Sequence, residues 1–278
     1  MPVDTAHVTR PRTGFPFLDQ GLVQTGSVLA FAHRGGALHP DLEGLENTMA
    51  AFQHAYNLGY RYLETDAHVT RDGVLLAFHD AMLDRVTGHV GSIAGLEYAE
   101  VAEARIGGRE RIPTLASLFE RFPDARFNID IKSAAAVGPL AALVDSLDAH
   151  ERVCVASFSQ RRIKKFRSLA GDRVATGTGP FEVAAFRLLP STALVDVLTR
   201  TRAAAIQVPH RRGPVTIVTR GLIARAHSLG KHVHVWTVDD PEQMSDLLDM
   251  GVDGLMTDRT DLLRDELIER GQWMGATR

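Results

Sequence analysis

Residues 60–70 have the sequence YRYLETDAHVT, in which polar and apolar side chains alternate over the length of a β-strand. Because successive side chains of a strand point to opposite faces, Glu64, Asp66 and His68 share one face and the other face is mainly apolar. We interpret the apolar face as covered by helices and the polar face as turned into an interior. Two carboxylates would then point into the same space.

Outward from this segment, apolar strand-like runs alternate with amphipathic helical stretches. The predicted strands are 28–33, 60–66, 126–132, 153–157, 174–177, 204–208, 232–237 and 253–257. The predicted helices are 47–58, 115–121, 135–149, 160–169, 181–199 (interrupted by Pro190), 215–229, 241–250 and 260–270. Eight strand and helix units in this order predict an α/β fold, a (β/α)8 TIM barrel.

The length of 278 residues, 45% of them hydrophobic, suits a single barrel of this kind. We expect residues 28–278 to form it and residues 1–27 to be an N-terminal leader that packs on the barrel. An insertion of about 71–112 follows strand 2, and its irregular part, 81–112, is too long for an ordinary connection.

Charge and composition exclude several classes of partner. The 31 basic and 34 acidic residues are interspersed and give a net charge of −3, so no nucleic-acid partner is expected. No run approaches the roughly 20 apolar residues of a transmembrane segment, and the first residues lack a secretory apolar core. The lone Cys154 lies in an apolar run, which favours simple packing in a reducing compartment. We expect a cytoplasmic location.

A third carboxylate accompanies the first two. In residues 126–132, RFNIDIK, the apolar side chains can face the helices, which turns Asp130 and Lys132 inward. Three carboxylates at neighbouring strand ends repel one another unless a cation or protons compensate. One divalent cation with oxygen ligands does so, and both Mg²⁺ and Ca²⁺ fit this ligand set. The alternative is that Glu64 and Asp66 form structural ion pairs with Arg61 or Lys132.

Two histidines reach the same place by different routes. Asp72-Gly73 predicts a tight turn that folds 74–79 back along the preceding strand and brings His79 about level with Asp66. His33 ends the first strand and is followed by Arg34-Gly35-Gly36, whose glycines permit close approach of an anion. A phosphodiester needs charge neutralisation, a base and an acid. We predict that Arg34 and Lys132 hold the phosphate while His33 and His79 exchange protons.

These residues resemble the glycerophosphodiester phosphodiesterase family over about residues 28–258. The matching motifs are His33-Arg34-Gly35, Glu46-Asn47-Thr48, Glu64-Thr65-Asp66, Thr70-Arg71-Asp72-Gly73, Phe78-His79-Asp80, Asp84-Arg85, Ile112-Pro113-Thr114-Leu115, residues 128–132, Trp236-Thr237-Val238, Gly251-Val252-Asp253-Gly254 and Thr257-Asp258.

The resemblance implies catalytic His33 and His79, a cation bound by Glu64, Asp66 and Asp130, and Trp236 at the mouth as a wall for the substrate. It implies hydrolysis of a small glycerophosphodiester to sn-glycerol 3-phosphate and an alcohol, in lipid and glycerol metabolism. The family usually has Glu where this chain has Asp130. Leu45 stands where Pro is common, and the loop 37–45 is longer than expected.

Two other readings remain at this point. A lyase similar to sphingomyelinase D also uses two histidines with a Glu, Asp, Asp metal set, which Asp130 matches. It would end at a cyclic phosphate instead of free glycerol phosphate. A non-catalytic barrel that binds phosphoesters predicts a damaged constellation, and both histidines and three carboxylates are present here.

Overall fold

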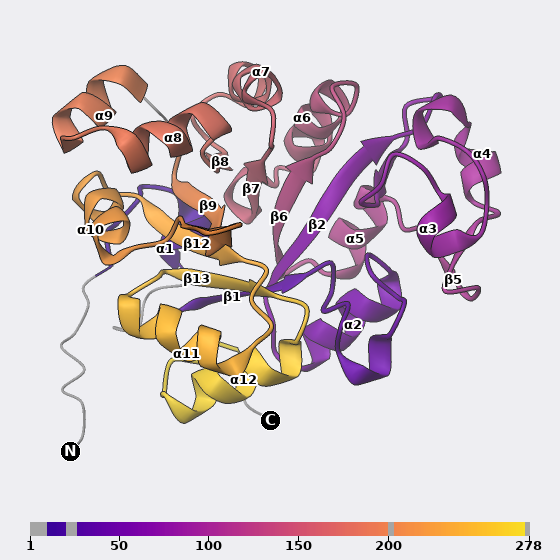
Figure 1. Ribbon diagram of the computed structural model, residues 1–278. Helices are drawn as coiled ribbons and strands as arrows, with labels where there is room; N and C mark the ends of the chain where they lie inside the picture. Colours follow the sequence, from indigo (N-terminus) through magenta and orange to yellow (C-terminus); the bar gives the residue numbers. More distant parts are fainter. Residues whose placement is uncertain (1–9, 21–26, 200–202, 276–278) are drawn as a thin grey trace.

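The computed structural model of the protein describes residues 10–20, 27–199 and 203–275. In this part of the chain a nine-stranded sheet contains a path of parallel strands in the order β8-β7-β6-β2-β1-β13-β12-β9 (Figure 1). The path consists of β1 (Leu29–His33), β2 (Tyr62–Val69), β6 (Arg126–Ile131), β7 (Val153–Ala156), β8 (Ala175–Thr176), β9 (Ala205–Pro209), β12 (His232–Trp236) and β13 (Gly254–Thr257).

The two ends of this path meet. Gly177, just after β8, bridges Ala205 of β9 in parallel, and Ala205 O accepts a hydrogen bond of 2.9 Å from Thr178 N. Strands that close on themselves leave no exposed sheet edge. The predicted (β/α)8 barrel is therefore confirmed.

Helices surround the barrel and bury its outer face. They are α2 (Met49–Asn57), α5 (Leu115–Arg121), α6 (Val137–Ser146), α7 (Gln160–Ala170), α8 (Pro180–Leu188), α9 (Thr192–Thr199), α10 (Arg220–Ser228), α11 (Pro241–Met250) and α12 (Thr260–Glu269), with the short 3-10 turns η2 (Pro40–Leu42) and η4 (His150–Arg152). Fully buried side chains such as Phe52, Phe127 and Phe166 lie between strands and helices. Each contributes about 1.5–3 kcal/mol of transfer free energy. In the described ranges, no helix has the length and apolarity needed to span a bilayer.

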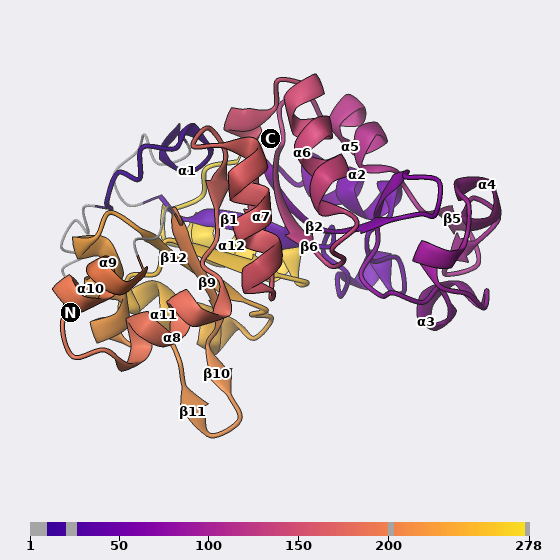
Figure 2. The same ribbon diagram turned by 90° about the horizontal axis from the view of Figure 1, so that it is seen from above.

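One predicted helix was wrong at its start. The expected helix 215–229 begins at Arg220, and Val215 instead belongs to a hairpin of β10 (Arg211–Arg212) and β11 (Val215–Thr216). The sequence between the two strands, Gly213-Pro214, forms the turn, with Gly213 at a φ of 59°. A β-branched pair after such a turn favours strand pairing over a helical start. Figure 2 shows the hairpin projecting from the body of the barrel.

The amino ends of the strands are covered by α1 (Pro16–Asp19), which lies within the predicted leader. The ring of Phe17 packs at 90° against Tyr62 with centroids 5.3 Å apart, and Tyr62 OH donates to Phe17 O at 2.7 Å. Inside the barrel, Phe31 and the buried Cys154 belong to the same apolar cluster. The leader positions 1–9 and 21–26 lie outside the described residues. Because this end is filled, the opposite rim is the open one.

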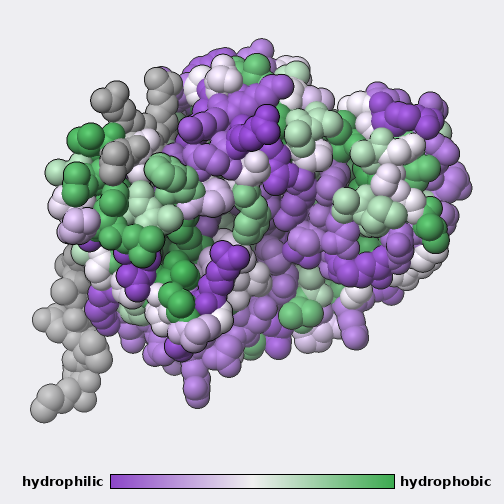
Figure 3. Space-filling model, turned by 45° about the horizontal axis from the view of Figure 1, so that its top comes forward, coloured by the Kyte–Doolittle hydropathy of each residue, from purple (hydrophilic) through white to green (hydrophobic). Residues whose placement is uncertain are grey.

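The residues after β2 build a lobe beside the barrel. It contains β3 (Leu75–Ala77), α3 (Asp84–Thr87), η3 (Ile93–Gly95), α4 (Tyr98–Val101), β4 (Arg105–Ile106) and β5 (Glu110–Arg111). A separate apolar cluster, including Phe78, Ile93 and Ile106, fills it. The lobe stands at the carboxyl end of β2 in Figure 1, and Figure 3 shows a hydrophilic surface between it and the apolar surface on the other side of the molecule.

Candidate active site

His33 ends β1 at the open rim, and a glycine turn follows it. His33 Nδ1 lies 2.8 Å from Asp258 Oδ1, and its Nε2 lies 3.8 Å from Glu64 Oε2. A Cβ on Gly35 would stand 2.7 Å from the Cβ of Ala51 in α2, so only glycine lets the turn approach the helix. Burial alone would lower the pKa of His33, but Glu64 and the hydrogen bond with Asp258 raise it to about 8.

Glu64 and Asp66 lie side by side on the inner face of β2, and both are buried. Glu64 Oε2 accepts a hydrogen bond from Arg34 N at 3.2 Å. Burial, together with the nearby charge of Asp66, raises the pKa of Glu64 to about 7. Burial would also raise the pKa of Asp66, but Lys132 and Arg34 hold it below its usual value. Glu64 therefore takes up a proton more readily than Asp66.

Asp130 and Lys132 complete the acidic cluster from the next strand. Asp66 and Asp130 are direct register partners of β2 and β6. Lys132 Nζ lies between them, 2.9 Å from Asp66 Oδ1 and 2.8 Å from Asp130 Oδ2. The other carboxylate oxygen of Asp130 is buried without a hydrogen-bond partner. Burial raises the pKa of Asp130, and the charge of Asp66 acts in the same direction. The ammonium of Lys132 acts in the opposite direction. Arg61, the other suggested partner, instead donates to main-chain carbonyls.

The predicted turn brings His79 to the same rim. β3 pairs antiparallel with β2, and Phe78 N donates to Asp66 O at 3.0 Å, so His79 is one residue past the level of Asp66. His79 Nδ1 lies 2.6 Å from Asp80 Oδ1. The backbone oxygen of His79 accepts from His68 Nε2 at 3.1 Å. Both histidines thus have Nδ1 held by an aspartate, which leaves Nε2 able to donate or accept a proton.

A network of charges around these groups was not foreseen from the sequence. Arg85, from the lobe, donates to both oxygens of Glu46 at 2.8 and 2.6 Å and also to Asp80. Glu46 in turn accepts from Arg34 at 3.2 Å. Although burial opposes it, this pairing lowers the pKa of Glu46. No local pattern in the sequence relates Arg85 to Glu46, because the two residues are 39 positions apart.

Asn47 contacts Asp66 and does not cap a helix. Its Nδ2 donates to Asp66 Oδ2 at 3.0 Å, and its Oδ1 accepts from Thr65 Oγ1 at 2.7 Å. A φ of 57° turns its side chain inward, and Thr48 is the residue whose hydroxyl caps α2. The amide therefore holds the Asp66 carboxylate in place.

Trp236 lies at the end of β12 beside an aromatic that the sequence did not single out. Phe158, which is 62% exposed, meets the Trp236 ring edge-on with centroids 5.4 Å apart. Lys132 Nζ lies 5.5 Å from the centroid of Phe158. Phe158 thus stands next to the ammonium of the acidic cluster, and Trp236 contacts Phe158. A motif search would miss Phe158, because a lone Phe in a loop carries no pattern.

The acidic cluster suits a hard cation in its chemistry. The orphaned oxygen of Asp130 and the raised pKa of Glu64 both indicate uncompensated negative charge in a buried place. The ligand atoms of the three carboxylates lie farther apart than those of a compact metal site. Among the described residues, the group whose ligand atoms lie within 4.8 Å of one another is His39, Asp41 and His54. Lys132 stands between two of the three. The donor set is all oxygen and fits Mg²⁺ or Ca²⁺.

Comparison with known proteins shows which sequences this chain is similar to. A model of the glycerophosphoryl diester phosphodiesterase family matches residues 33–262. "Probable glycerophosphodiester phosphodiesterase 2" of Mycobacterium tuberculosis is 42% identical over 254 residues, which are 90% of this chain and 95% of that protein.

Two solved structures illustrate the likeness of fold. A glycerophosphodiester phosphodiesterase of Agrobacterium tumefaciens has a TM-score of 0.68 and 25% identity, covering 85% of this chain and 99% of its own. A phosphodiesterase of Oleispira antarctica, solved with its product sn-glycerol-3-phosphate, has a TM-score of 0.72 and 20% identity, covering 86% and 96%. The sequence resemblance is confirmed: the chain is a phosphoric diester hydrolase and belongs to the glycerophosphoryl diester phosphodiesterase family.

Proposed function

We propose that the protein hydrolyses glycerophosphodiesters to sn-glycerol 3-phosphate and an alcohol, using His33 and His79 as acid and base beside one divalent cation. The observation that carries this proposal is the pair of histidine-aspartate contacts, 2.8 Å for His33 and 2.6 Å for His79, at the rim that holds the buried acidic cluster. The Oleispira antarctica phosphodiesterase of the same fold holds the same product.

Charge neutralisation is the first requirement of the reaction. Arg34 and Lys132 bind the non-bridging oxygens of the phosphate, and Glu64, Asp66 and Asp130 hold Mg²⁺ or Ca²⁺. The cation supplies Lewis-acid stabilisation of the charge that develops on phosphorus oxygens. Lys132 already neutralises Asp66 and Asp130 from 2.9 and 2.8 Å. With substrate bound, Lys132 would contact the phosphate, and the carboxylates would ligate the cation.

Proton transfer is the second requirement. One imidazole removes a proton from the attacking water as the new bond between its oxygen and phosphorus forms. The other gives a proton to the departing alkoxide as its bond to phosphorus breaks. Both rings are orientated by an aspartate at Nδ1, so that Nε2 is the atom that exchanges the proton. Although burial opposes it, Glu64 and Asp258 raise the pKa of His33 to about 8, which favours this ring as the acid.

An aromatic pair at the rim suits the organic part of the diester. Phe158 lies near the ammonium of Lys132, and Trp236 packs edge-on against Phe158. Aromatic faces accept both apolar chains and quaternary ammonium groups. We therefore include choline and lysophospholipid diesters among the substrates to be assayed.

The test is a product assay with purified protein. Glycerophosphocholine, glycerophosphoethanolamine, glycerophosphoinositol and a lysophospholipid are incubated with Mg²⁺ or Ca²⁺, and glycerol 3-phosphate is measured. We expect turnover that a chelator abolishes and that His33→Ala and His79→Ala each lower at least about a hundredfold. A cyclic phosphate as the end product would refute the proposal in favour of a lyase. Tight phosphoester binding without turnover would refute it in favour of a binding protein.

A further inference from the structure

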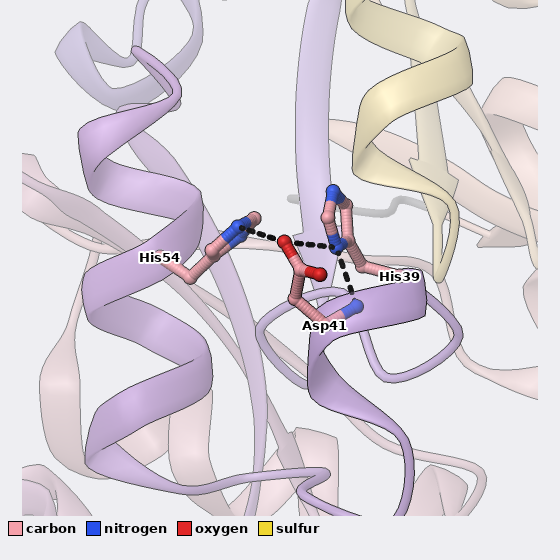
Figure 4. Close-up of side chains that lie close together, drawn as sticks. All are labelled: His39, Asp41 and His54. Carbon is pink, nitrogen blue, oxygen red and sulfur yellow. Dashed lines mark hydrogen bonds and ion pairs between the residues drawn. The ribbon is translucent and has the colours of Figure 1, made fainter.

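A second group of metal-ligating side chains lies outside the acidic cluster. His39 and Asp41 belong to the start of η2 in the loop between β1 and α2, and His54 belongs to α2 (Figure 4). One ligand atom from each of the three lies within 4.8 Å of the other two. These residues take no part in the reaction proposed above.

The Asp41 carboxylate is turned toward both imidazoles. Its Oδ2 lies 3.8 Å from His54 Nε2 and 3.9 Å from His39 Nδ1, and the ring centroids of the two histidines are 4.2 Å apart. The Asp41 side chain is 75% exposed, so it could point into water instead. His39 Nδ1 accepts a hydrogen bond from Asp41 N at 3.2 Å. That nitrogen is therefore unprotonated, and a metal ion bound here would take over the lone pair that now accepts from Asp41 N.

His54 is placed to act as a ligand because its Nε2 faces the Asp41 carboxylate. Its Nδ1 is buried without a hydrogen-bond partner. Burial and the neighbouring His39 lower the pKa of His54, against the opposite effect of Asp41 and Asp261. A neutral imidazole is the form that binds metals.

The charges around the group favour a cation. Asp261, at the first turn of α12, acts on both histidines, and its own charge is shared with Arg259 through contacts of 3.0 and 2.7 Å. Asp41 and Asp261 thus place two carboxylates near two imidazoles. The basic side chain of Arg259 lies near this group and forms an ion pair with Asp261.

We propose that His39, Asp41 and His54 bind a transition-metal ion of the Zn²⁺ class at a site separate from the carboxylates of the barrel rim. Two imidazoles and one carboxylate select Zn²⁺, Co²⁺ or Ni²⁺ over the hard ions Mg²⁺ and Ca²⁺. Tetrahedral Zn²⁺ with ligands at about 2.0–2.2 Å separates neighbouring ligand atoms by roughly 3.3–3.5 Å. A shift of the side chains by about half an ångström brings the 3.8 and 3.9 Å distances to Asp41 into this range, and water would complete the shell.

The site would tie two elements together. The loop from Arg34 to Asn47 carries residues of the active site at both ends, and His39 and Asp41 lie in its middle. A metal ion shared with His54 would fasten this middle to α2. We therefore expect the ion to stabilise the folded protein without being required for the chemical step.

The experiment measures metal binding directly. Tag-free protein is freed of metal, supplied with excess Mg²⁺ to occupy the barrel rim, and titrated with Co²⁺ followed by visible absorption, then with Zn²⁺ in competition. The variants are His54→Gln and His39→Asn, of which the second keeps an acceptor for the N–H of Asp41. His89→Gln, an exposed histidine in the lobe, is the matched control. Thermal unfolding with and without Zn²⁺ is recorded for each protein.

We expect wild type and His89→Gln to bind one equivalent of Co²⁺ and Zn²⁺, and His54→Gln and His39→Asn to lose affinity at least about tenfold. Zn²⁺ at about a hundredfold excess over its Kd should raise the thermal midpoint of wild type by roughly 5 °C and leave that of His54→Gln unchanged. Equal Zn²⁺ affinity in wild type and both variants would overturn the proposal. So would loss of the Zn²⁺ equivalent in Glu64→Gln with retention in His54→Gln.

Discussion

His33 Nδ1 and Asp258 Oδ1 lie 2.8 Å apart, although the two residues are 225 positions apart in the chain. They meet because β1 and β13 are register partners, with Ala32 opposite Thr257, so that the residues following each strand emerge together. The carboxylate fixes one nitrogen of the imidazole and directs the other toward Glu64 at 3.8 Å. The imidazole that we propose as the acid is thus positioned by the residue that follows the last barrel strand.

Asp258→Asn should lower kcat/KM about tenfold to a hundredfold, because the variant loses the charge that stabilises the imidazolium. The hydrogen bond of Asp258 is one of the causes that raise the pKa of His33 to about 8. Its loss lowers that pKa, so the limb of the pH–rate profile that reports His33 should move to lower pH. Asp265→Asn, on an exposed side chain of α12, is the control. An unshifted profile would contradict this role for Asp258.

The alternation of β2 and β6 allowed Glu64, Asp66 and Asp130 to be predicted at one rim, because strand periodicity is a local property of the sequence. The turn at Asp72-Gly73 was equally local, and the antiparallel pairing of β3 with β2 confirms it. Asp258 and Arg85 act over separations of 225 and 39 residues, where no periodicity relates the partners. The hairpin at Val215 was missed because its apolar residues continue the helical pattern of α10. The turn at Gly213-Pro214 favours strand pairing there in spite of this pattern.

Glu64→Gln should abolish most activity and yet stabilise the metal-free protein at pH 8. In the folded state the pKa of Glu64 is about 7, raised from 4.5 by burial and by Asp66. A folded-state pKa above the unfolded one means that stability is present below pH 4.5 and is lost as pH rises through 7. Glutamine does not ionise, so the variant avoids this loss, on the order of 2 kcal/mol in free energy of unfolding at pH 8.

Urea unfolding of both proteins in chelator, at pH 5 and pH 8, tests the sign. The variant should gain over wild type as pH rises, and Mg²⁺ or Ca²⁺ should stabilise wild type more than the variant. A variant that is less stable than wild type at pH 8 in chelator would show that the buried carboxylate is not strained.

Asp130→Asn should weaken binding of the catalytic cation by roughly tenfold to a hundredfold, because the orphaned oxygen of Asp130 would then belong to a neutral amide. Asp130→Glu keeps the charge and should retain most of the affinity. Calorimetric titration with Mg²⁺ and Ca²⁺ measures both, with the exposed Asp145→Asn as control. Unchanged affinity in Asp130→Asn would remove this residue from the ligand set.

Arg85→Lys should lower kcat/KM about tenfold while leaving the thermal midpoint within roughly 2 °C of wild type. The guanidinium binds both oxygens of Glu46 and also Asp80, a fork that an ammonium cannot reproduce. Its half-exposed position keeps the contribution to global stability small. Backbone amides of α3 should exchange hydrogen faster in the variant. Arg109→Lys, an exposed residue of the same lobe, should change neither quantity.

Asp253→Asn should lower the free energy of unfolding at pH 7 by roughly 2–4 kcal/mol, because Asp253 is fully buried and bound by Arg10 at 2.9 Å and His227 at 2.8 Å. Burial alone would raise the pKa of Asp253, but His227 and Arg10 lower it from 3.8 to about 2. Since the folded-state pKa lies below the unfolded one, the stabilisation is present above pH 3.8 and is lost as pH falls toward 2. The difference between the two proteins in urea midpoint should therefore shrink as pH falls below about 4. A difference that widens between pH 4 and pH 2 would mean that the carboxylate is protonated more readily in the folded barrel than in the unfolded chain, the reverse of what its contacts with Arg10 and His227 impose.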